Sequence, residues 1–395
     1  MRGWRWLVMG LALVALIAGV FATGYWLGNH RVAQAEADSG FDVLWSVRAI
    51  LDRSFIGEIP SAQEQAYGAV HGLVAAFDDP YTVFVEPAPR EMERDELAGQ
   101  FGGIGAYMTR NETGDLVVTV IRDRPAAKAG VQDGDILLEV DGTAITKEMK
   151  VDEIVALVRG DIGTKVALKL QRPGQAEPYA VAVVRERIET PSVEWRVLDK
   201  DKHIGYARIS LFGQRTSQEL QDGLADLASQ GVDKLVLDLR GNGGGLVDAA
   251  VDIVSQFVKD GQVLREVKRG GQERFYPTKN VKAPAQAWEL VLLVDGGTAS
   301  ASEIVAGSLR DQKRAVLIGE KTYGKGSVQE VHELPDGSSL HVTVARWLTP
   351  NRTQIDKTGL APDVAVTISE DDRSAGRDPQ LARAQAWLGG ERSSD

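Results

Sequence analysis

Hydrophobic positions are spaced differently in successive parts of the chain, and the first part is the most apolar. Residues 6–30 contain no Asp, Glu, Lys or Arg, and about 20 apolar residues are enough to span a bilayer. Arg2 and Arg5 precede this run, which indicates a cytoplasmic N-terminus. Ala33-Gln34-Ala35 also matches a signal-peptidase site. We expect residues 1–40 to hold a cytoplasmic stub, a transmembrane anchor and a linker, with a cleaved signal peptide as the alternative. Either one exports the rest of the chain.

Beyond residue 40 the apolar spacing changes twice. Residues 41–97 carry apolar side chains at helical spacing and predict an N-terminal helical region, used for packing or dimerisation or simply covering the core. Residues 98–187 and 188–370 each combine short apolar runs, typical of buried strands, with helical stripes. The spacing predicts strands over 116–121, 133–142 and 204–209, helices over 125–130 and 151–158, and a hairpin of the strands 328–334 and 339–348. Residues 371–395 are mostly polar, with one short helical pattern at Leu381, Ala384 and Leu388, and we expect a loosely held C-terminal tail. The predicted fold class is multidomain α/β (α+β): a transmembrane helix, a helical arm, a small αβ domain, and a larger core of mixed sheet flanked by helices.

The stretch 288–329 places serines and a lysine after two buried strands. The first strand is Leu290–Val294, and a glycine turn leads from it into a helix that begins with Ser300 and Ser302. The second strand, 314–318, runs into a glycine-rich loop that carries Lys325. A serine at the strand-to-helix turn and this lysine can therefore lie side by side.

Lys325 is the candidate general base of this stretch. A hydroxyl becomes an effective nucleophile when a base removes its proton, and the five histidines of the chain lie outside the stretch. A lysine needs its pKa lowered by roughly 3 units for this role, and burial among uncharged neighbours lowers it. Free N–H groups at the helix start could hold an oxyanion. The alternatives are an ordinary helix cap with a glycine turn, or a phosphate-binding loop. The latter requires Ser or Thr after the lysine, where this chain has Gly326.

Composition narrows the class of function. The formal net charge of −11 argues against a nucleic-acid partner. The chain has no cysteine, so it has neither a disulfide nor a cysteine metal site. Its histidines form no ligand cluster in the sequence. We therefore expect no metal and no cofactor.

The stretch resembles the carboxy-terminal processing proteases, also called tail-specific proteases, which are serine peptidases with a Ser/Lys dyad. Residues 297–303 (GTASASE) match the family's G-S-A-S-A-S-E, with Thr298 for the usual Ser, and residues 324–329 match its G-K-G-x-V-Q loop. The spacing from nucleophile to lysine is also the family's, since Lys325 follows Ser300 by 25 positions. The resemblance implies that Ser300 is the nucleophile, Lys325 the general base and Gln329 the residue that orients the lysine. Ser302 would then serve in helix capping or packing.

A second glycine-rich loop, residues 240–245, follows the apolar strand KLVLDL. It resembles the family's D-L-R-x-N-P-G-G loop, with Gly243 where proline is usual. The resemblance implies an oxyanion hole made by the N–H of Ala301 together with that of Gly244 or Gly245. A dinucleotide site is disfavoured because the G-x-G-x-x-G fingerprint with a following acidic residue is absent.

Residues 98–187 resemble a PDZ domain. Gly102, Gly103, Ile104 and Gly105 precede a strand, and the later AG-x-x-x-GDIL pattern strengthens the resemblance. Such domains add a peptide as a strand and hold its terminal carboxylate with backbone N–H groups. Residues 102–105 are therefore the candidate cradle. Arg159 is a candidate for reporting tail binding to the active site, and the alternative is a solvated charge at a helix end.

The resemblance implies a serine endopeptidase that recognises C-terminal tails of envelope proteins through its PDZ domain, with residues 188–370 as its protease core. The expected partners are protein or peptide substrates with a free C-terminus and the membrane, with a homo-oligomer or an activating adaptor as further possibilities. The expected location is the inner (plasma) membrane, with the catalytic part periplasmic, or secretion after signal cleavage. The alternative function is a PDZ adaptor that binds tails without cleaving them.

Overall fold

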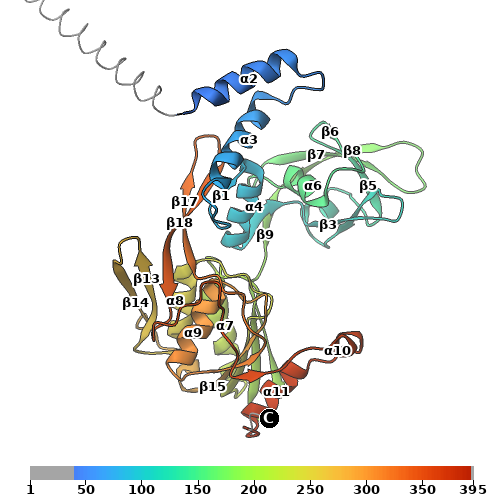
Figure 1. Cartoon of the computed structure of the whole chain (residues 1–395). Coiled ribbons are helices and arrows are strands. Elements are labelled where there is room, and N and C mark those ends of the chain that lie inside the picture. Colours follow the sequence, from blue (N-terminus) through green and yellow to red (C-terminus); the bar gives the residue numbers. More distant parts are fainter. Residues whose placement is uncertain (1–39, 393–395) are drawn as a thin grey trace, which may run out of the picture. The chain divides into compact units, whose positions relative to one another are not determined.

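A computed structural model describes residues 40–392 of the chain (Figure 1). The chain divides into two compact units, one through residue 70 and one from residue 71 onward. The described part of the first unit contains α2 (Asp42–Ser54) and the start of α3 (Ala62–Ala75). None of the residues of α2 is buried. These two helices confirm the helical spacing predicted for the first part of residues 41–97.

The predicted transmembrane helix requires correction as part of the fold class. Between residues 40 and 392, none of the helices is long and apolar enough to cross a membrane. The apolar run 6–30, on which the prediction depended, lies outside the described residues. The fold that the structure supports is a mixed α/β core with an αβ domain of the PDZ type.

The core of the second unit is a six-stranded sheet with the order β10-β11-β12-β15-β16-β19. Its strands are β10 (Val193–Asp199), β11 (Ile204–Ile209), β12 (Lys234–Asp238), β15 (Glu289–Val294), β16 (Val316–Gly319) and β19 (Val364–Ala365). The neighbours from β11 to β19 run parallel, and β10 closes one edge antiparallel. Crossover helices α7 (Thr216–Ser229), α8 (Val247–Phe257) and α9 (Ala301–Asp311) connect them. The predicted strands of this domain are confirmed.

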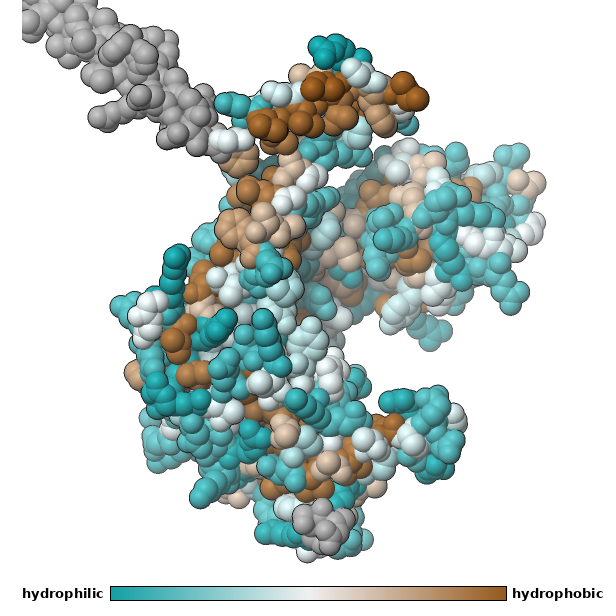
Figure 2. All heavy atoms as spheres, in the orientation of Figure 1, coloured by the Kyte–Doolittle hydropathy of each residue, from teal (hydrophilic) through white to brown (hydrophobic). Residues whose placement is uncertain are grey.

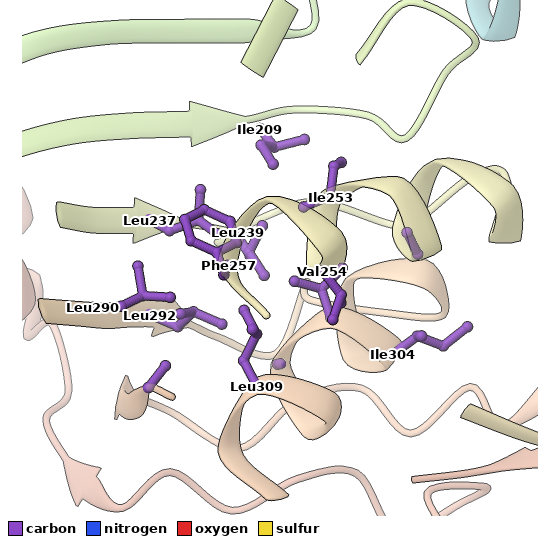
Figure 3. Packing of buried hydrophobic residues seen from close by; sticks show 14 of the residues in the cluster. Ile209, Leu237, Leu239, Ile253, Val254, Phe257, Leu290, Leu292, Ile304 and Leu309 are labelled. Atoms are coloured by element: carbon purple, nitrogen blue, oxygen red, sulfur yellow. The ribbon is translucent and has the colours of Figure 1, made fainter. Parts of the chain in front are cut away.

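Both faces of this sheet are covered, which explains the uninterrupted apolar runs of its strands. Successive side chains of a strand point to opposite faces. Leu235 and Leu237 of β12 thus face the cluster formed with α7, α8 and α9, while Val236 faces a second cluster that includes Leu388. Figure 3 shows Leu237, Leu239, Leu290 and Leu292 pointing toward residues Ile253 and Phe257 of α8 and Leu309 of α9.

A second sheet lies around the hairpin that follows the lysine loop. Its strands are β1 (Val83–Val85), β13 (Gln262–Lys268), β14 (Glu273–Pro277), β17 (Ser327–Glu333) and β18 (Ser339–Leu348). β18 pairs with β1, β13 and β17, all antiparallel. The β17–β18 hairpin was predicted, whereas the β13–β14 hairpin was not. α4 (Pro87–Ala98) adjoins the β17–β18 hairpin through an ion pair between Arg90 and Glu333, whereas the short 3₁₀ turn Pro284–Ala287 packs on α7 and α8.

The PDZ-type domain is a separate sheet with the order β3-β4-β5-β7-β8. Its strands are β3 (Ala106–Arg110), β4 (Leu116–Val120), β5 (Asp135–Val140), β6 (Thr143–Ala144), β7 (Lys165–Gln171) and β8 (Tyr179–Val184). Its helices are α5 (Pro125–Lys128) and α6 (Val151–Val158). A two-stranded ribbon, β2 (Gln100–Gly103) with β9 (Glu186–Glu189), joins the two ends of the domain to the rest. These helices and the strands β4 and β5 match the predicted segments.

The expectation of a loosely held C-terminal tail is wrong for its described residues. The tail contains α10 (Glu370–Ser374) and α11 (Pro379–Leu388). α11 packs on β12, β15 and β16, with Ala384 and Leu388 buried. Its N-cap residue Asp378 also binds Arg240, with 2.9 Å between Oδ2 and Nη2. The sequence indicated the helical pattern of Leu381, Ala384 and Leu388, but not that these side chains pack on the sheet.

Candidate active site

Three neighbouring parallel strands deliver the candidate residues to one edge of the sheet. β12, β15 and β16 pair in that order. The loops that follow them carry Gly244, Ser300 and Lys325 respectively. In open α/β sheets, the carboxyl ends of parallel strands are the usual location of a site. The topology therefore explains why residues so far apart in sequence come together.

Ser300 occupies a strained position at the start of α9. Its φ of 56° and ψ of −117° lie in a region that non-glycine residues rarely adopt. Neighbouring contacts hold the turn in place: the Thr298 hydroxyl donates to the Leu239 carbonyl at 2.9 Å, and the Ala299 N–H donates to the Asn242 carbonyl at 3.0 Å. Such strain, held by the surroundings, is common where a side chain must be presented for chemistry.

Ser302 lies in a different environment from Ser300. Its side chain is fully buried and donates a hydrogen bond of 2.9 Å to the Asn242 carbonyl. Ser300 is only partly buried. The structure therefore gives Ser302 a packing role beneath the turn and leaves Ser300 accessible.

The glycine loop after β12 lies against the Ser300 turn. A Cβ at Gly244 would come within 2.8 Å of the Ser300 Cβ and 2.9 Å of the Ala301 nitrogen, and its φ is +107°. The Gly244 N–H already donates to Asn242 Oδ1 at 2.9 Å. Gly245 is exposed, and the Phe212 backbone bonds to its two neighbours instead. Of the two candidate oxyanion donors in this loop, Gly245 is thus the one whose N–H is available.

A buried carboxylate connects the serine turn to the lysine loop. Glu303 Oε2 accepts hydrogen bonds from the backbone N–H of Ser300 at 3.0 Å and of Lys325 at 2.9 Å. Its other oxygen accepts from Thr322 Oγ1 at 2.5 Å and from the Gly324 N–H at 2.8 Å. Burial raises the pKa of Glu303, although these hydrogen bonds oppose the change. The backbone N–H groups of Ser300 and Lys325 are thereby held by the same atom, Glu303 Oε2.

The environment of Lys325 suits a basic role. Burial lowers the pKa of Lys325 from its ordinary value, and the charges of Glu93 and Asp79 oppose this effect. Its Nζ lies 5.0 Å from the centre of the Tyr81 ring. The Trp347 indole donates to the Lys325 carbonyl at 3.2 Å. The base is therefore held by its backbone at both sides and shielded at its amine.

Gln329 lies on β17, directly after a bulge in its pairing with β18. Its amide donates to Ser327 Oγ at 2.8 Å and to Thr343 Oγ1 at 3.3 Å. Among the hydrogen bonds within residues 40–392, none joins Gln329 to Lys325. Gln329 follows Lys325 closely along the chain, but its amide is directed to two hydroxyl groups and not to the lysine.

The candidate tail cradle is only partly a free loop. Gly102 and Gly103 belong to β2 and pair with β9. Ile104 is buried, and Gly105, with φ of +68°, leads into β3. β3 pairs with β4 on one side and is an edge strand of its sheet, with α6 packed nearby. An edge strand beside a helix is the geometry that admits a peptide as an added strand.

Arg159 ends α6 and is partly buried. Its guanidinium lies 3.9 Å above the centre of the Phe101 ring. Its Nε is buried and makes no hydrogen bond within the described part of the chain. This contact with β2 differs from that of a freely solvated charge at a helix end.

Sequence reasoning missed Glu303 as the link between the two loops. The signal was present, because a serine followed three residues later by glutamate is the capping-box pattern. It also missed Tyr81 and Asp79, which lie beside Lys325 although they belong to the helical arm. Within the described residues, no cluster of three or more His, Cys, Asp or Glu side chains could hold a metal ion.

These features together define a serine-type peptidase with a mixed α/β catalytic core and a PDZ domain. Residues 203–366 match the model of peptidase family S41, and residues 116–172 match that of the PDZ domain. The chain is 33% identical over 366 residues to the carboxy-terminal processing protease CtpA of Bacillus subtilis, covering 92% of this chain and 77% of that protein. It is 34% identical to the carboxy-terminal-processing protease of Bartonella bacilliformis, covering 85% and 78%.

Among solved structures, the photosystem II D1 C-terminal processing protease is 34% identical, covers 82% of this chain and 86% of that chain, and has a TM-score of 0.47. The chain belongs to the family of carboxy-terminal processing proteases, within the S41 peptidases.

Proposed function

We propose that this peptidase hydrolyses its substrates with a Ser300/Lys325 dyad. The observation that carries the proposal is the Glu303 carboxylate, which accepts hydrogen bonds from the backbone N–H groups of both residues. A base and a nucleophile held on two rigid loops need little reorganisation to react. The lowered pKa of Lys325 supports a neutral amine as the base.

The proposed reaction follows from these positions. The neutral amine of Lys325 takes the proton of the Ser300 hydroxyl while Oγ attacks the substrate carbonyl carbon. The resulting oxyanion accepts hydrogen bonds from the N–H of Ala301 at the helix start and from that of Gly245. The ammonium of Lys325 then returns its proton to the departing amine, leaving an acyl group on Ser300. A water molecule, deprotonated by Lys325, releases the product and restores the serine.

The experiment compares Ser300→Ala with Ser302→Ala on an unfolded protein such as casein. We expect Ser300→Ala to abolish cleavage, because it removes the attacking oxygen. Ser302→Ala should keep most of the activity and lose about 1 kcal/mol of folding stability, since its hydroxyl makes one buried hydrogen bond. Cleavage by Ser300→Ala at the wild-type rate would rule out the dyad.

We further propose that the PDZ domain captures C-terminal tails of protein substrates along the free edge of β3. The edge position of this strand and the positive φ of Gly105 before it support this mode. The name of the B. subtilis relative, a carboxy-terminal processing protease, also favours it.

The proposed location is outside the cytoplasm, in the cell envelope. Its support is the sequence: residues 6–30 lack charged side chains and follow Arg2 and Arg5, as in export signals. The proposal is tested by adding an external protease to cells whose outer layers have been opened. The measurement is whether the catalytic part is digested while the cytoplasm is still intact. Protection of the catalytic part until the cytoplasm is lysed would contradict export.

We propose that the first unit mediates self-association. α2 exposes large apolar side chains, among them Trp45 at 60% and Leu51 at 53% exposure. Figure 2 shows a brown, hydrophobic area over this helix. Together with α3 they line a groove of about 550 Å³. An exposed apolar area of this kind is common at interfaces between chains. Light scattering of Trp45→Glu against wild type should show a smaller particle for the variant, and equal mass would contradict the proposal.

A further inference from the structure

The segment Asp79-Pro80-Tyr81-Thr82 lies between α3 and β1 and is a compact turn. The Thr82 hydroxyl donates to Asp79 Oδ2 at 2.6 Å, and the Tyr81 N–H donates to Asp79 Oδ1 at 3.3 Å. The Asp79 carboxylate thus closes the turn on itself. Its side chain is desolvated, but hydrogen bonds from Thr343 and Thr82 outweigh this and lower its pKa. Asp79 is therefore ionised and fixed at neutral pH.

This turn is attached to the β17–β18 hairpin, which follows the lysine loop. Val83 pairs with His341 at the start of the β1–β18 ladder. The Thr343 N–H donates to Thr82 Oγ1 at 3.1 Å, and Thr343 Oγ1 in turn accepts from the Gln329 amide at 3.3 Å. A continuous chain of hydrogen bonds thus leads from the turn to β17, the strand that begins two residues after Lys325.

Tyr81 covers the amine of the lysine. Lys325 Nζ lies 5.0 Å from the ring centre, a distance at which an aromatic face attracts an ammonium group. Burial, with the neighbouring Tyr323 phenol, raises the pKa of Tyr81 to about 12. The phenol therefore stays neutral over the working range, and the backbone of Tyr81 is held by its hydrogen bond to Asp79. Such a ring limits the rotamers of a long side chain and keeps water away from its amine.

We propose that Tyr81 is a positioning residue for the reaction, whose ring holds the Lys325 amine toward Ser300 and excludes water from it. The proposal rests on the proposed role of Lys325 as the base. A lysine side chain carries about 2 kcal/mol of rotamer entropy, so a fixed wall increases the fraction of molecules in the reactive geometry. Exclusion of water favours the neutral amine, whereas the ring face favours the ammonium. Exclusion is the larger effect here, because the side chain of Lys325 is half-buried and burial is the main cause of its lowered pKa.

Other charges face the same site and must be considered with the ring. Glu93 of α4 and Asp79 act on Lys325 and favour its charged form. His341 of β18 also faces it, and its pKa is lowered by burial and by Lys325 among other charges. Glu303, Asp356 and Tyr323 face the Tyr81 phenol. A substitution at Tyr81 leaves Glu93, Asp79 and His341 in place, and Tyr81→Phe, which keeps the ring, is the reference for any shift in the pH profile of a variant that lacks the ring.

The test measures kcat and KM of the full chain against pH, with a peptide substrate that has a free C-terminus. Tyr81→Phe keeps the ring and should stay within about threefold of wild type. Tyr81→Ala should lower kcat at neutral pH by about tenfold with KM unchanged, and should move the acid limb of the profile to higher pH by about one unit. A merely structural role would lower the amount of folded enzyme without moving the limb.

Two further variants keep the result decisive. Tyr81→Leu fills the space without an aromatic ring and should move the acid limb of the pH profile in the same direction by a smaller amount. This variant replaces Tyr81→Ala in the test if Tyr81→Ala does not fold. Phe275→Ala is the matched control, because it removes an aromatic ring 4.9 Å from Arg265 in the same sheet, and its profile should equal that of wild type. An acid limb that stays in place or moves to lower pH in the folded Tyr81 variants would overturn the proposal. Lys325→Arg in the same assay separates a failure of the Tyr81 proposal from a failure of the dyad, because full activity of Lys325→Arg would overturn the dyad itself.

Discussion

At the scale of single residues, Glu303 decides how the two reacting groups meet. It is fully buried, and its two carboxylate oxygens accept four hydrogen bonds from the serine turn and the lysine loop. A buried ionisable group is tolerated when it is hydrogen-bonded in this way. The residue does not need to touch the substrate, because its effect is to hold the backbone at Ser300 and at Lys325.

Glu303→Gln tests this positioning. The amide NH₂ would replace one oxygen and face N–H donors, so that at least one buried donor loses its acceptor. We expect a loss of roughly 1–3 kcal/mol in the free energy of unfolding and a fall in kcat of more than tenfold, measured by denaturant titration and peptide hydrolysis. Glu330→Gln is the control, since Glu330 is exposed on β17. Equal stability and activity of both variants would contradict the role of Glu303.

The titration of Lys325 predicts how activity depends on pH. The ordinary pKa of a lysine is 10.5, and burial lowers that of Lys325. The neutral amine is the reactive form, so activity is low below the pKa of Lys325 and rises as the pH increases through it. Lys325→Arg should be inactive across the range, because a guanidinium does not lose its proton. A kcat/KM profile of the wild type that falls with rising pH through the neutral range would contradict a lysine base.

At the scale of elements, three parallel strands and the loops after them form the site. The loop after β12 approaches the turn after β15 so closely that Gly244 has no room for a side chain. Its φ of +107° is also strained for any other residue. The glycine is thus required twice, by conformation and by contact with Ser300.

Gly244→Ala should therefore lose most of its activity while the sheet remains folded. The added methyl group pushes against the Ser300 Cβ and the Ala301 nitrogen, and a displacement of about 1 Å at a reacting group costs on the order of a hundredfold in rate. Gly243→Ala is a matched control from the same loop, because nothing lies within 4 Å of a Cβ there and its φ is not positive. Equal kcat for the two variants would show that this contact is unimportant.

Most helices and strands could be predicted because their apolar periods are regular. The six residues Ile204–Ile209 of β11 and the eight of α6 begin and end where the pattern places them. The β13–β14 hairpin was missed because charged residues interrupt its apolar positions. The docking of α11 was missed because the short apolar stripe of Leu381, Ala384 and Leu388 indicates a helix but not the surface on which it packs.

The candidate site was predictable only along the chain. Local motifs indicated Ser300 and Lys325, since their turns and spacing are encoded nearby. The contacts of Tyr81 with Lys325 and of Asp378 with Arg240 depend on tertiary packing. No local pattern specifies which distant segment will cover a given side chain, so these partners had to come from the structure.

At the scale of the whole molecule, the PDZ domain and the core are separate sheets with separate cores. The site in the core is assembled without any residue of the PDZ domain. A domain that adds nothing to the chemistry but offers a free strand edge is suited to choosing substrates. The specificity of the enzyme should therefore depend on a group that only the PDZ domain reads.

We expect that group to be the terminal carboxylate of the substrate. A charge-assisted hydrogen bond to it is worth about 1.5–3 kcal/mol, so amidation of the C-terminus should weaken binding roughly ten- to hundredfold. Binding is measured with the Ser300→Ala protein and cleavage with wild type, using one peptide in its acid and amide forms. Acetylation of the N-terminus is the control modification and should have little effect.

A pair of glycine variants assigns the effect to the loop before β3. At Gly105, φ is +68° and a Cβ would lie 2.3 Å from the Arg124 Cβ, whereas Gly174 has a similar φ of +84° and open space around it. Gly105→Ala should weaken the acid peptide toward the affinity of the amide, and Gly174→Ala should not. Equal binding of the acid and amide peptides to the Ser300→Ala protein, with equal cleavage of both by the wild type, would show that the carboxylate is not recognised. Residues 98–187 would then have only the role of a spacer.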